Sequence, residues 1–571
     1  MQHRTLTRIR LLSGFILLLG FLLIVRLYYV QVIQGDYYVE KAERQYVHTT
    51  KDLYSRGSIF FTTKDGEKVS AAAIKSGYSL AVNPEMISDA KATYQILLPH
   101  LTISEEEFIT QATLPNRTYV EIEPALEAAT ADTINALELS GVMLYRNQWR
   151  YYPGGDVSAR SIGFVGYTET SADTLHGKYG LERYYDELLS RDTTALSVNF
   201  FAEIFSNLGN LVFNSKDTNQ GDIVTTIEPT VARMLDRVLI ETQDQYQSAL
   251  TGGLIMNPKT GEIFALNTIP TYDLNNRGDA TMEQFQNPLV ENVYEMGSIM
   301  KALTMAAGLD SGVVTPTTTY YDAGFLDLDT YTIKNFDGKG RGTVDMQQVL
   351  NQSLNTGVSH IVTLMGKERF RDYFVDLKLG SESGIDLPNE AQGLISNLQS
   401  PRQLEYATAS FGQGIAMTPI VTARALASLG NGGYMVTPHL VSAIEYEDGT
   451  KKEVNYPAGA QVFKPETSET ISRMLTTVVD DALRGGSAAL PNHSVAAKTG
   501  TAQIANPAGG YYDDRYLHSF FGYFPSYDPQ FIIFLYTVEP KNVQYASETL
   551  TTPFMDLTKF LINYYNIPPD R

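Results

Sequence analysis

One apolar run near the N-terminus does most to limit how this chain of 571 residues can fold. Residues 11–25 are almost entirely apolar, and the apolar character resumes after Arg26. About 20 apolar residues cross a bilayer as a helix, so we expect one membrane-spanning helix at residues 11–33. A short tail, residues 1–10, would then lie on one side of the membrane and the rest of the chain on the other.

Basic residues before the run predict its orientation. Arg4, Arg8 and Arg10 precede it, and a basic flank stays in the cytoplasm. A cleaved signal peptide is the alternative, but the sequence RLYYVQVIQGDYY after the run lacks the small residues of a cleavage site. We therefore expect a single-pass protein of the cytoplasmic membrane, with the N-terminus inside and the large folded part outside.

Composition excludes several classes of protein. The chain has 64 acidic and 44 basic residues and a net charge of -20, which argues against nucleic acid as a partner because phosphate binding needs positive potential. It has no cysteine, so disulfide frameworks and cysteine-ligated metals are excluded. The eight histidines form no HExxH pattern and there is no Walker A pattern, so we expect neither a metal nor another cofactor.

Two folded domains are expected after the anchor. Residues 34–222 mix short strands and helices, and the polar stretch 215–222 indicates a boundary loop. In residues 223–571, strands dominate both ends and helices the middle, which predicts an α+β domain built on one antiparallel sheet. A hairpin turn is expected at residues 257–261. Long helices are expected to begin at residues 298, 343, 401 and 465.

The first motif with chemical meaning is Ser298-Ile299-Met300-Lys301. Residues three apart on a helix share a face, so the amine of Lys301 would lie beside the hydroxyl of Ser298. A serine needs such an adjacent base to become a nucleophile. A cation in the first turn of a helix opposes the helix dipole without structural gain, which is typical of a functional site.

A second motif, Ser353-Leu354-Asn355, supplies a hydroxyl and an amide. The hydroxyl of Ser353 can relay a proton, and the amide of Asn355 can hold an amide group of a substrate. Neither group is specific alone, because short motifs of this kind occur by chance.

A third motif, Lys498-Thr499-Gly500-Thr501, is expected on an edge strand. Glycine at position 500 would let the backbone of a substrate approach the strand closely. Lys498 and Thr499 can bind a carboxylate. Taken together, the three motifs match a set shared by penicillin-binding proteins and class A β-lactamases.

The sequence also contains weaker copies of the three patterns, at residues 88–91, 197–199 and 259–261. Residues 83–85 carry the signals of a helix start, which would place the first copy in the middle of a surface helix. The third copy falls at the tip of the expected hairpin, where its glycine serves the turn. Context therefore favours the set that contains Ser298.

At these motifs the chain resembles the class B penicillin-binding proteins. Segments similar to the catalytic domain of the family are YEMGS (294–298), NPKTGEI (257–263), SGIDLPNE (383–390), SFGQGIAMTP (410–419) and KTGTAQ (498–503). Segments similar to its pedestal domain are RG (56–57), YPGG (152–155), IGFVG (162–166) and YGLE (179–182). The chain departs from the family at Met296 and Ala302, where proline is usual, and at RGSIFFTTKDG (56–66), where the family has RGxIxDRNG.

The resemblance implies a fold and an activity. The fold is a penicillin-binding, serine β-lactamase-like transpeptidase domain, with helices on both faces of an antiparallel sheet, at residues 223–571. It stands on an elongated pedestal domain of the dimerisation type, at residues 34–222, behind the transmembrane helix. The activity is that of a serine D,D-transpeptidase, which cross-links peptidoglycan stem peptides and is the target of β-lactams.

The resemblance also implies roles for the residues of the motifs. Ser298 attacks the D-Ala-D-Ala carbonyl, Lys301 takes its proton, and Ser353, Asn355 and Lys498 complete the catalytic group. Thr499, Gly500 and Thr501 bind the carboxylate end of the peptide. Backbone N–H groups of Ser298 and Thr501 form the oxyanion hole.

Three other classes of protein use the same kind of serine nucleophile as a D,D-transpeptidase. A β-lactamase would need a Glu-x-x-Leu-Asn context for deacylation, which residues 390–393 do not supply. A penicillin sensor would need a cytoplasmic effector region, and about ten residues precede the anchor. A D,D-carboxypeptidase stays open, because water could replace the acceptor amine.

One residue bears on the branch of the family. Phe411 before Gly-Gln-Gly resembles the division branch, which is FtsI-like, whereas elongation-type relatives usually carry a smaller or aliphatic residue there. The division branch implies septal cell-wall synthesis, with a SEDS-type glycan polymerase and other membrane proteins of the divisome as partners. An elongation-type transpeptidase that serves cell shape is the alternative.

Overall fold

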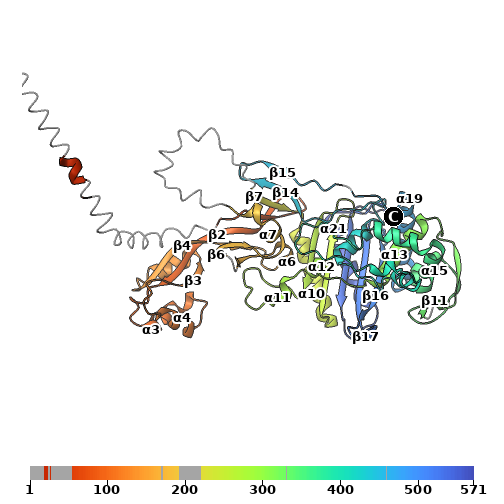
Figure 1. Ribbon diagram of the computed structural model, residues 1–571, viewed down its shortest axis with the longest axis horizontal. Helices are drawn as coiled ribbons and strands as arrows, with labels where there is room; N and C mark the ends of the chain where they lie inside the picture. The colour runs from red at the N-terminus through yellow and green to blue at the C-terminus, as the bar shows by residue number, and fades with distance from the viewer. Residues whose placement is uncertain are drawn as a thin grey trace, which may run out of the picture. The chain divides into compact units, whose positions relative to one another are not determined.

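The computed structural model describes residues 18–23, 26, 55–168, 171–191, 220–328, 331–457 and 459–571 (Figure 1). None of the helices within these ranges is both long enough and apolar enough to span a bilayer. The membrane-spanning helix expected at 11–33 lies outside the described residues, apart from 18–23 and 26, as do residues 1–10 and the weak motif copy at 197–199.

The described chain forms two compact units that do not follow the order of the sequence. Residues 74–149 form the smaller unit. Residues 56–73 and 150–191 belong to the larger unit, together with the C-terminal part of the chain. Strand β2 (Lys68–Val82) contributes to both units.

The smaller unit packs helices against a small sheet. Strand β2 pairs with β3 (Val120–Leu126) and with β4 (Val142–Tyr151). The helices are α3 (Ala90–Leu97), α4 (Glu105–Ala112) and α5 (Ala128–Asn135). The core includes Leu80, Tyr94, Leu97 and Phe108.

The helix start expected at residues 83–85 is wrong. Asp89 caps α3 by accepting a hydrogen bond from the backbone N–H of Ala92 at 3.0 Å. Ser88 therefore precedes the helix and Lys91 lies in its first turn, so the weak serine-x-x-lysine copy is not in mid-helix. Two competing cap signals, at Asn83 and Asp89, lie within seven residues here, and the helix begins after Asp89.

In the larger unit, one sheet has the strand order β15-β14-β7-β1-β2. Strands β1 and β7 are parallel and the other pairs in this order are antiparallel. The bounds are β1 (Ile59–Thr62), β7 (Gly221–Thr225), β14 (Val441–Tyr446) and β15 (Lys451–Glu453).

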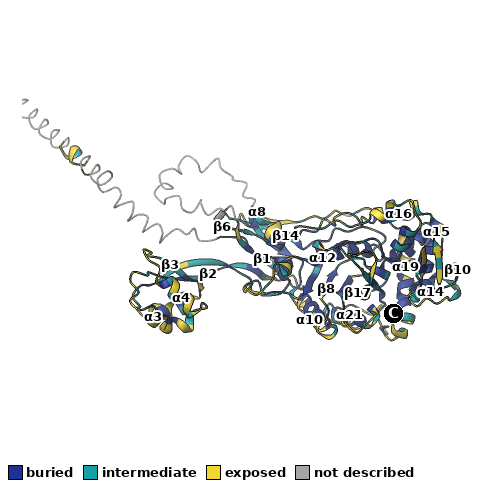
Figure 2. Ribbon diagram, turned by 60° about the horizontal axis from the view of Figure 1, so that its bottom comes forward, coloured by how far each residue is buried: buried dark blue, intermediate teal, exposed yellow. Residues whose placement is uncertain are grey.

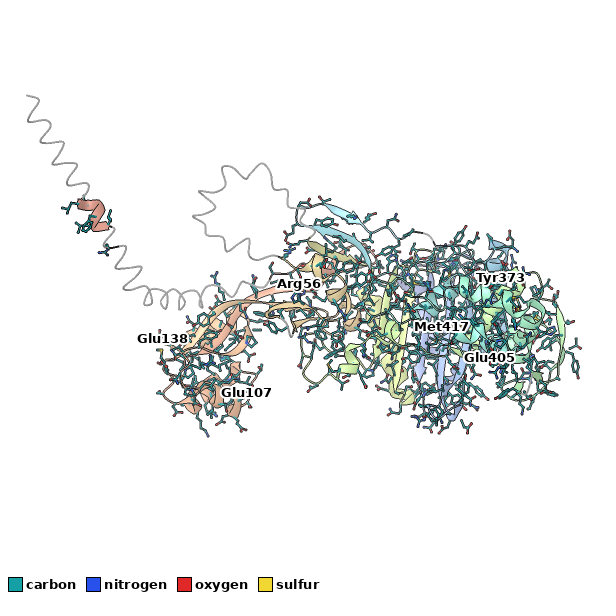
Figure 3. All side chains as sticks on the ribbon, in the orientation of Figure 1. Arg56, Glu107, Glu138, Tyr373, Glu405 and Met417 are labelled. Carbon is teal, nitrogen blue, oxygen red and sulfur yellow. The ribbon has the colours of Figure 1, made fainter. Side chains whose placement is uncertain are left out.

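A buried charge cluster joins three of the segments that resemble the pedestal domain. Glu182 accepts hydrogen bonds from Arg56 and Arg150, each at 2.6 Å, and the hydroxyl of Tyr152 lies 3.3 Å from it. Arg56, labelled in Figure 3, also pairs with Asp186 at 2.7 Å. The side chains of Arg56 and Glu182 are 1% and 0% exposed, so removing either would leave a buried charge uncompensated.

The second sheet of the larger unit is fully antiparallel, with the order β16-β17-β18-β8-β9. Its strands are β16 (Ala496–Ala505), β17 (Tyr511–Phe524), β18 (Phe531–Val538), β8 (Leu250–Met256) and β9 (Ile263–Ile269). Near-continuous burial along β8, β9 and β18 requires cover on both faces, and Figure 2 shows β8 in the buried colour.

Helices cover the two faces of this sheet (Figure 1). On one face, α10 (Pro229–Tyr246) and α21 (Thr551–Tyr564) contact the strands and each other. On the other, α18 (Pro419–Ala427) and α19 (Pro465–Thr477) contact the strands, and α13 (Met300–Asp310) packs against both helices. The expected α+β architecture is confirmed.

Two expected helix starts differ from the structure. Residue 343 lies in strand β13 (Gly342–Asp345), and the helix α14 (Met346–Asn351) begins after it, capped by Asp345. The helix expected from residue 401 is α17 (Leu404–Ala409). The hairpin turn at 257–261 and the helix start at Pro465 are confirmed.

The remaining elements are short or belong to the region between α13 and α19. They are η2 (Leu98–His100), α6 (Ala159–Ile162), β5 (Val165–Thr168), β6 (Ser171–Gly177), α7 (Gly180–Tyr184), α8 (Asp186–Leu189), α11 (Met282–Phe285), α12 (Pro288–Glu291), η4 (Gly297–Ile299), β10 (Thr319–Asp322), β11 (Phe325–Leu328), β12 (Tyr331–Lys334), α15 (Asn355–Met365), α16 (Lys367–Asp376), η5 (Ser396–Gln399), η6 (Val478–Ala482), η7 (Leu483–Gly486) and α20 (Ala546–Thr549).

Candidate active site

Two glycines let the turn that carries Ser298 pack tightly between other segments. Gly297 has φ +65°, and a Cβ there would lie 2.8 Å from the carbonyl oxygen of Thr501. Gly412 has φ +82°, and its Cβ would lie 2.3 Å from the carbonyl oxygen of Gly297. Glycine tolerates both the left-handed conformation and the close approach. The turn η4 is therefore fixed between β16 and the Gly-Gln-Gly segment, and it holds Ser298 two residues before the start of α13.

Lys301 lies one turn further along, at the second residue of α13, and is fully buried. Its Nζ donates to the carbonyl oxygen of Ser353 at 2.5 Å and to its Oγ at 3.1 Å. Tertiary structure thus brings the first and second motifs into contact across 52 residues of sequence.

Lys498 approaches the same hydroxyl from strand β16. Its Nζ donates to Ser353 Oγ at 3.1 Å and to the carbonyl oxygen of Thr499 at 3.0 Å. Ser353 Oγ is thus the point at which the three motifs meet. A hydroxyl between two amines can accept a proton from one and pass its own on.

Burial changes the proton affinity of both lysines. Burial first, and then the charge of Lys498, hold the pKa of Lys301 well below its usual range. Burial lowers the pKa of Lys498 to about 8. Both shifts favour the neutral amine, and the fall at Lys301, which burial and a neighbouring charge both cause, suits a group that must accept a proton near neutral pH.

Ser353 is held in an uncommon backbone conformation between α14 and α15. Its φ is +54°, which a non-glycine residue adopts at a cost. Asn355, two residues later, begins α15, and its Nδ2 donates to the carbonyl oxygen of Lys334 at 2.8 Å. The other N–H and the oxygen of this amide are left to contact a ligand.

A buried carboxylate, which the motifs do not reveal, holds the start of α15 in place. Asp322, 1% exposed, accepts hydrogen bonds from Thr356 Oγ1 at 2.8 Å, from Asn335 Nδ2 at 2.9 Å and from the backbone N–H of Arg341 at 3.0 Å. Thr356 follows Asn355 directly. Asp322 thus fixes the start of α15 to the strands β10 and β12, and no local spacing in the sequence signals this link.

Strand β16 is the edge of the second sheet, as expected. Its Gly500 is required for a further reason, which is the close packing of the strand against η4. A Cβ at Gly500 would lie 2.7 Å from the carbonyl oxygen of Met296 and 3.0 Å from the backbone nitrogen of Ile299. Glycine here makes room for the nucleophile turn. The hydroxyl of Thr501 accepts the backbone N–H of Ala546 at 3.1 Å, so its own proton is free to donate.

A cavity of about 940 Å³ is lined by all the predicted site residues except Gly500. Those that line it are Ser298, Lys301, Ser353, Asn355, Lys498, Thr499 and Thr501. Four further lining residues, which sequence reasoning missed, are Tyr331, Phe336, Arg484 and Tyr545. Phe336 and Tyr545 come from separate segments and meet edge to face, with their ring centroids 5.7 Å apart.

Arg484 fixes the wall of the cavity that Tyr545 belongs to. Its guanidinium donates to the carbonyl oxygens of Ser547 and Glu548 and to Thr552 Oγ1, at 3.0–3.1 Å. It has φ +49° in a turn that continues into two glycines. The Arg-Gly-Gly sequence could have indicated a turn, but not where its side chain would bind.

Two of the weak motif copies belong to different compact units. Residues 88–91 belong to the smaller unit. Residues 259–261 form the β8–β9 turn, where Lys259 pairs with Asp528. The described residues also include no group of three or more His, Cys, Asp or Glu side chains that could hold a metal ion.

Two family models match the chain. One, described as the penicillin binding protein transpeptidase domain, matches residues 251–558. The other, the penicillin-binding protein dimerisation domain, matches residues 55–198. The first contains all the motif residues that line the cavity.

Similar proteins span nearly the whole chain. Stage V sporulation protein D of Bacillus subtilis is 30% identical over 556 residues, which are 95% of this chain and 83% of that protein. The peptidoglycan D,D-transpeptidase FtsI of Escherichia coli is 25% identical over 577 residues, which are 99% of this chain and 92% of that protein.

Among solved structures, penicillin binding protein 2X from Streptococcus thermophilus is similar, with a TM-score of 0.71 and 20% identity. The superposition covers 90% of this chain and 80% of that one. At this identity the likeness establishes the fold alone, and it agrees with the α+β architecture described above.

Proposed function

Because this chain belongs to the penicillin-binding protein transpeptidase family and is a class B peptidoglycan D,D-transpeptidase, we propose that Ser298 is its nucleophile. The observation that carries the proposal is the meeting of Lys301 and Lys498 on Ser353 Oγ, in the same cavity as Ser298. Three segments far apart in the sequence supply these groups, and a chance motif would not assemble in this way.

In the acylation step, Ser298 Oγ attacks the carbonyl carbon between the two D-alanines of a stem peptide. Lys301, neutral because it is buried, takes the hydroxyl proton. Backbone N–H groups of Ser298 and Thr501 stabilise the negative charge that develops on the carbonyl oxygen. The edge position of β16 supports this role for Thr501, because an edge strand has backbone groups without a strand partner.

Collapse of the intermediate breaks the peptide bond and needs a proton on the leaving amine. Ser353 delivers its hydroxyl proton to the terminal D-alanine and is reprotonated from the lysine pair. Its hydrogen bonds to both amines support this relay. An amine of a neighbouring strand then attacks the acyl-enzyme and forms the cross-link, while a β-lactam leaves an ester that does not turn over.

The other motif residues hold the donor peptide. Lys498, Thr499 and Thr501 bind the terminal carboxylate, with the hydroxyl proton of Thr501 directed to it because its oxygen already accepts the N–H of Ala546. Gly500 shapes the strand. Asn355 holds the amide that precedes the two D-alanines, using the N–H that Lys334 leaves free.

Product analysis tests this function. With lipid-linked peptidoglycan and an acceptor strand, the enzyme should release one D-alanine for each cross-linked dimer that forms. Without the acceptor, D-alanine release should slow markedly. Equal release of D-alanine in both reactions, with no dimer, would identify a D,D-carboxypeptidase instead.

We also propose how the protein is placed in the cell. Residues 11–33 anchor it in the cytoplasmic membrane with residues 1–10 inside. Residues 34–222 form the pedestal domain, and residues 223–571 the transpeptidase domain, outside. The apolar run and its basic flank support this topology.

The septal role is proposed from Phe411 and from the similarity to the peptidoglycan D,D-transpeptidase FtsI of Escherichia coli. A SEDS-type glycan polymerase and divisome membrane proteins would be its partners. Depletion should block septation and give filaments or enlarged undivided cells. Rounded cells that still divide would favour the elongation branch.

A further inference from the structure

The walls of the catalytic cavity carry positive charge and no carboxylate. Among its lining residues in the described part of the chain, none is acidic and five are basic: Lys301, which is neutral in the proposed function, and Lys334, Arg341, Arg484 and Lys498, which carry the positive charge. The whole chain has the opposite balance, with a net charge of -20. A cleft of one sign concentrates ligands of the other sign. The cavity is therefore suited to a ligand with more than one negative group.

Three of these basic residues, Lys334, Arg341 and Arg484, lie outside the three motifs, and two of the three already have partners. Arg341 pairs with Asp337 at 2.8 Å. Arg484 donates to the wall segment at residues 547–552. Lys334 differs from both, because its side chain is exposed, lines the cavity, and has no hydrogen-bond or ion-pair partner among the described residues.

The position of Lys334 relative to Asn355 indicates which part of a donor peptide it meets. The carbonyl oxygen of Lys334 accepts the hydrogen bond from Asn355 Nδ2 at 2.8 Å. In the proposed function, Asn355 holds the amide that precedes the two D-alanines. The carbonyl of that amide belongs to the diamino acid of the stem peptide, so Lys334 is placed beside this residue, and its side chain is long enough for the ammonium to reach it.

We infer that Lys334 forms a subsite for a carboxylate on the side chain of the donor's diamino acid. This inference rests on the proposed function. The side chain of a plain lysine ends in an ammonium, which Lys334 repels. A diamino acid with a second carboxylate at the end of its side chain is zwitterionic there, and its carboxylate pairs with Lys334. The enzyme thus prefers stem peptides of the carboxylated type as donors.

Two synthetic peptides that end in D-Ala-D-Ala, and that differ only in the side-chain carboxylate of the diamino acid, test the subsite. The measured quantity is kcat/KM for release of D-alanine. Exposed ion pairs contribute up to about fivefold in an equilibrium or rate, so the wild type should prefer the carboxylated peptide by about three- to fivefold. High salt should reduce this preference, because it screens an exposed pair.

Lys334→Gln should bring the ratio of the two kcat/KM values close to one, and its thermal unfolding should match that of the wild type because the side chain is exposed. Lys339→Gln is the matched control: Lys339 is exposed in the same region but does not line the cavity. It should keep the preference of the wild type.

Equal rates for the two peptides in the wild type, or an unchanged preference in Lys334→Gln, would overturn the subsite. So would a preference that Lys339→Gln abolishes equally. Failure of the proposed function would look different, because the wild type would then not form a covalent penicillin adduct on Ser298.

Discussion

At the scale of single residues, the two lysines of the site are in different surroundings and so suit different tasks. Lys301 is fully buried on α13, and its pKa falls well below the usual range through burial and the charge of Lys498. Lys498 has a pKa of about 8 and keeps its charge at neutral pH. We therefore assign proton acceptance to Lys301 and carboxylate binding to Lys498.

The rate of acylation should depend on pH in two directions. Lys301 must be neutral, so the rate should rise with pH as its ammonium loses a proton. Lys498 must be charged, so the rate should fall as the pH passes about 8. A stopped-flow pH profile with a chromogenic cephalosporin measures both limbs. A rate that keeps rising well above pH 8 would remove Lys498 from carboxylate binding.

Lys301→Arg should slow acylation by roughly 10²–10⁴-fold, because the guanidinium stays protonated and cannot serve as a base. The rate constant for labelling by fluorescent penicillin measures the effect. Lys259→Arg, at the exposed hairpin turn, is the control and should react like the wild type. Near-normal acylation of Lys301→Arg would refute the base role.

Most of the candidate site could be predicted from local patterns, because the three motifs preserve the residue types that the chemistry needs. Asp322 and Arg484 could not. Asp322 acts on Thr356 across 34 residues and Arg484 on Ser547 across 63, and each is an ordinary charged residue in its own neighbourhood. Only tertiary contacts give such residues a function.

At the scale of elements, the site depends on how closely strand β16 approaches the turn η4. Gly412 of the Gly-Gln-Gly segment and Gly500 of β16 both lie against η4. A Cβ on either glycine would push its segment away from this turn. The family-like segments around residues 410–419 thus have a packing reason that their sequence alone does not reveal.

Gly500→Ala should therefore abolish or greatly slow acylation while leaving the protein folded. The added carbon would lie 2.7 Å from the carbonyl oxygen of Met296, and relief of the overlap moves the turn that carries Ser298. Overpacking of this kind costs about 1–3 kcal/mol in the free energy of unfolding. Penicillin labelling and thermal unfolding measure the two effects.

Gly278→Ala is the control for this substitution, because no atom lies within 4 Å of the carbon it adds. It should label like the wild type. If Gly500→Ala also labels at the normal rate, β16 and η4 are less tightly coupled than the structure indicates.

The prediction of elements failed where two local signals competed. Helix signals at residues 83–85 and 343 were overridden by a turn and by strand β13, and in each case an aspartate further along capped the helix. Propensity and cap rules do not decide between neighbouring starts, whereas pairing of β13 with β10 does.

At the scale of the whole molecule, the compact units are not continuous segments, whereas the boundary near residue 222 was expected between two continuous segments and stays a prediction. Residues 56–73 and 150–191 pack with the C-terminal part of the chain. Strand β1 pairs in parallel with β7, and the charge cluster around Glu182 joins residues 56, 150 and 182. A sequence pattern cannot anticipate pairings over such separations.

Removal of the anchor should leave an active soluble protein. A chain that begins at Gln45 lacks the apolar run, which is the one segment of the sequence long enough to span a bilayer. It should remain in the supernatant after ultracentrifugation and still react with fluorescent penicillin, whereas the full chain should partition with membranes. A shortened protein that stays with the membrane would reveal another attachment.

The most direct test of Ser298 as the nucleophile is to identify the residue that penicillin acylates. The protein is labelled, digested and mapped by mass spectrometry, with Ser298→Ala and Ser88→Ala as variants. We expect one adduct, on the peptide that contains Ser298, which is lost in Ser298→Ala and unchanged in Ser88→Ala. An adduct on another serine of the wild type, or one retained by Ser298→Ala, would contradict this assignment.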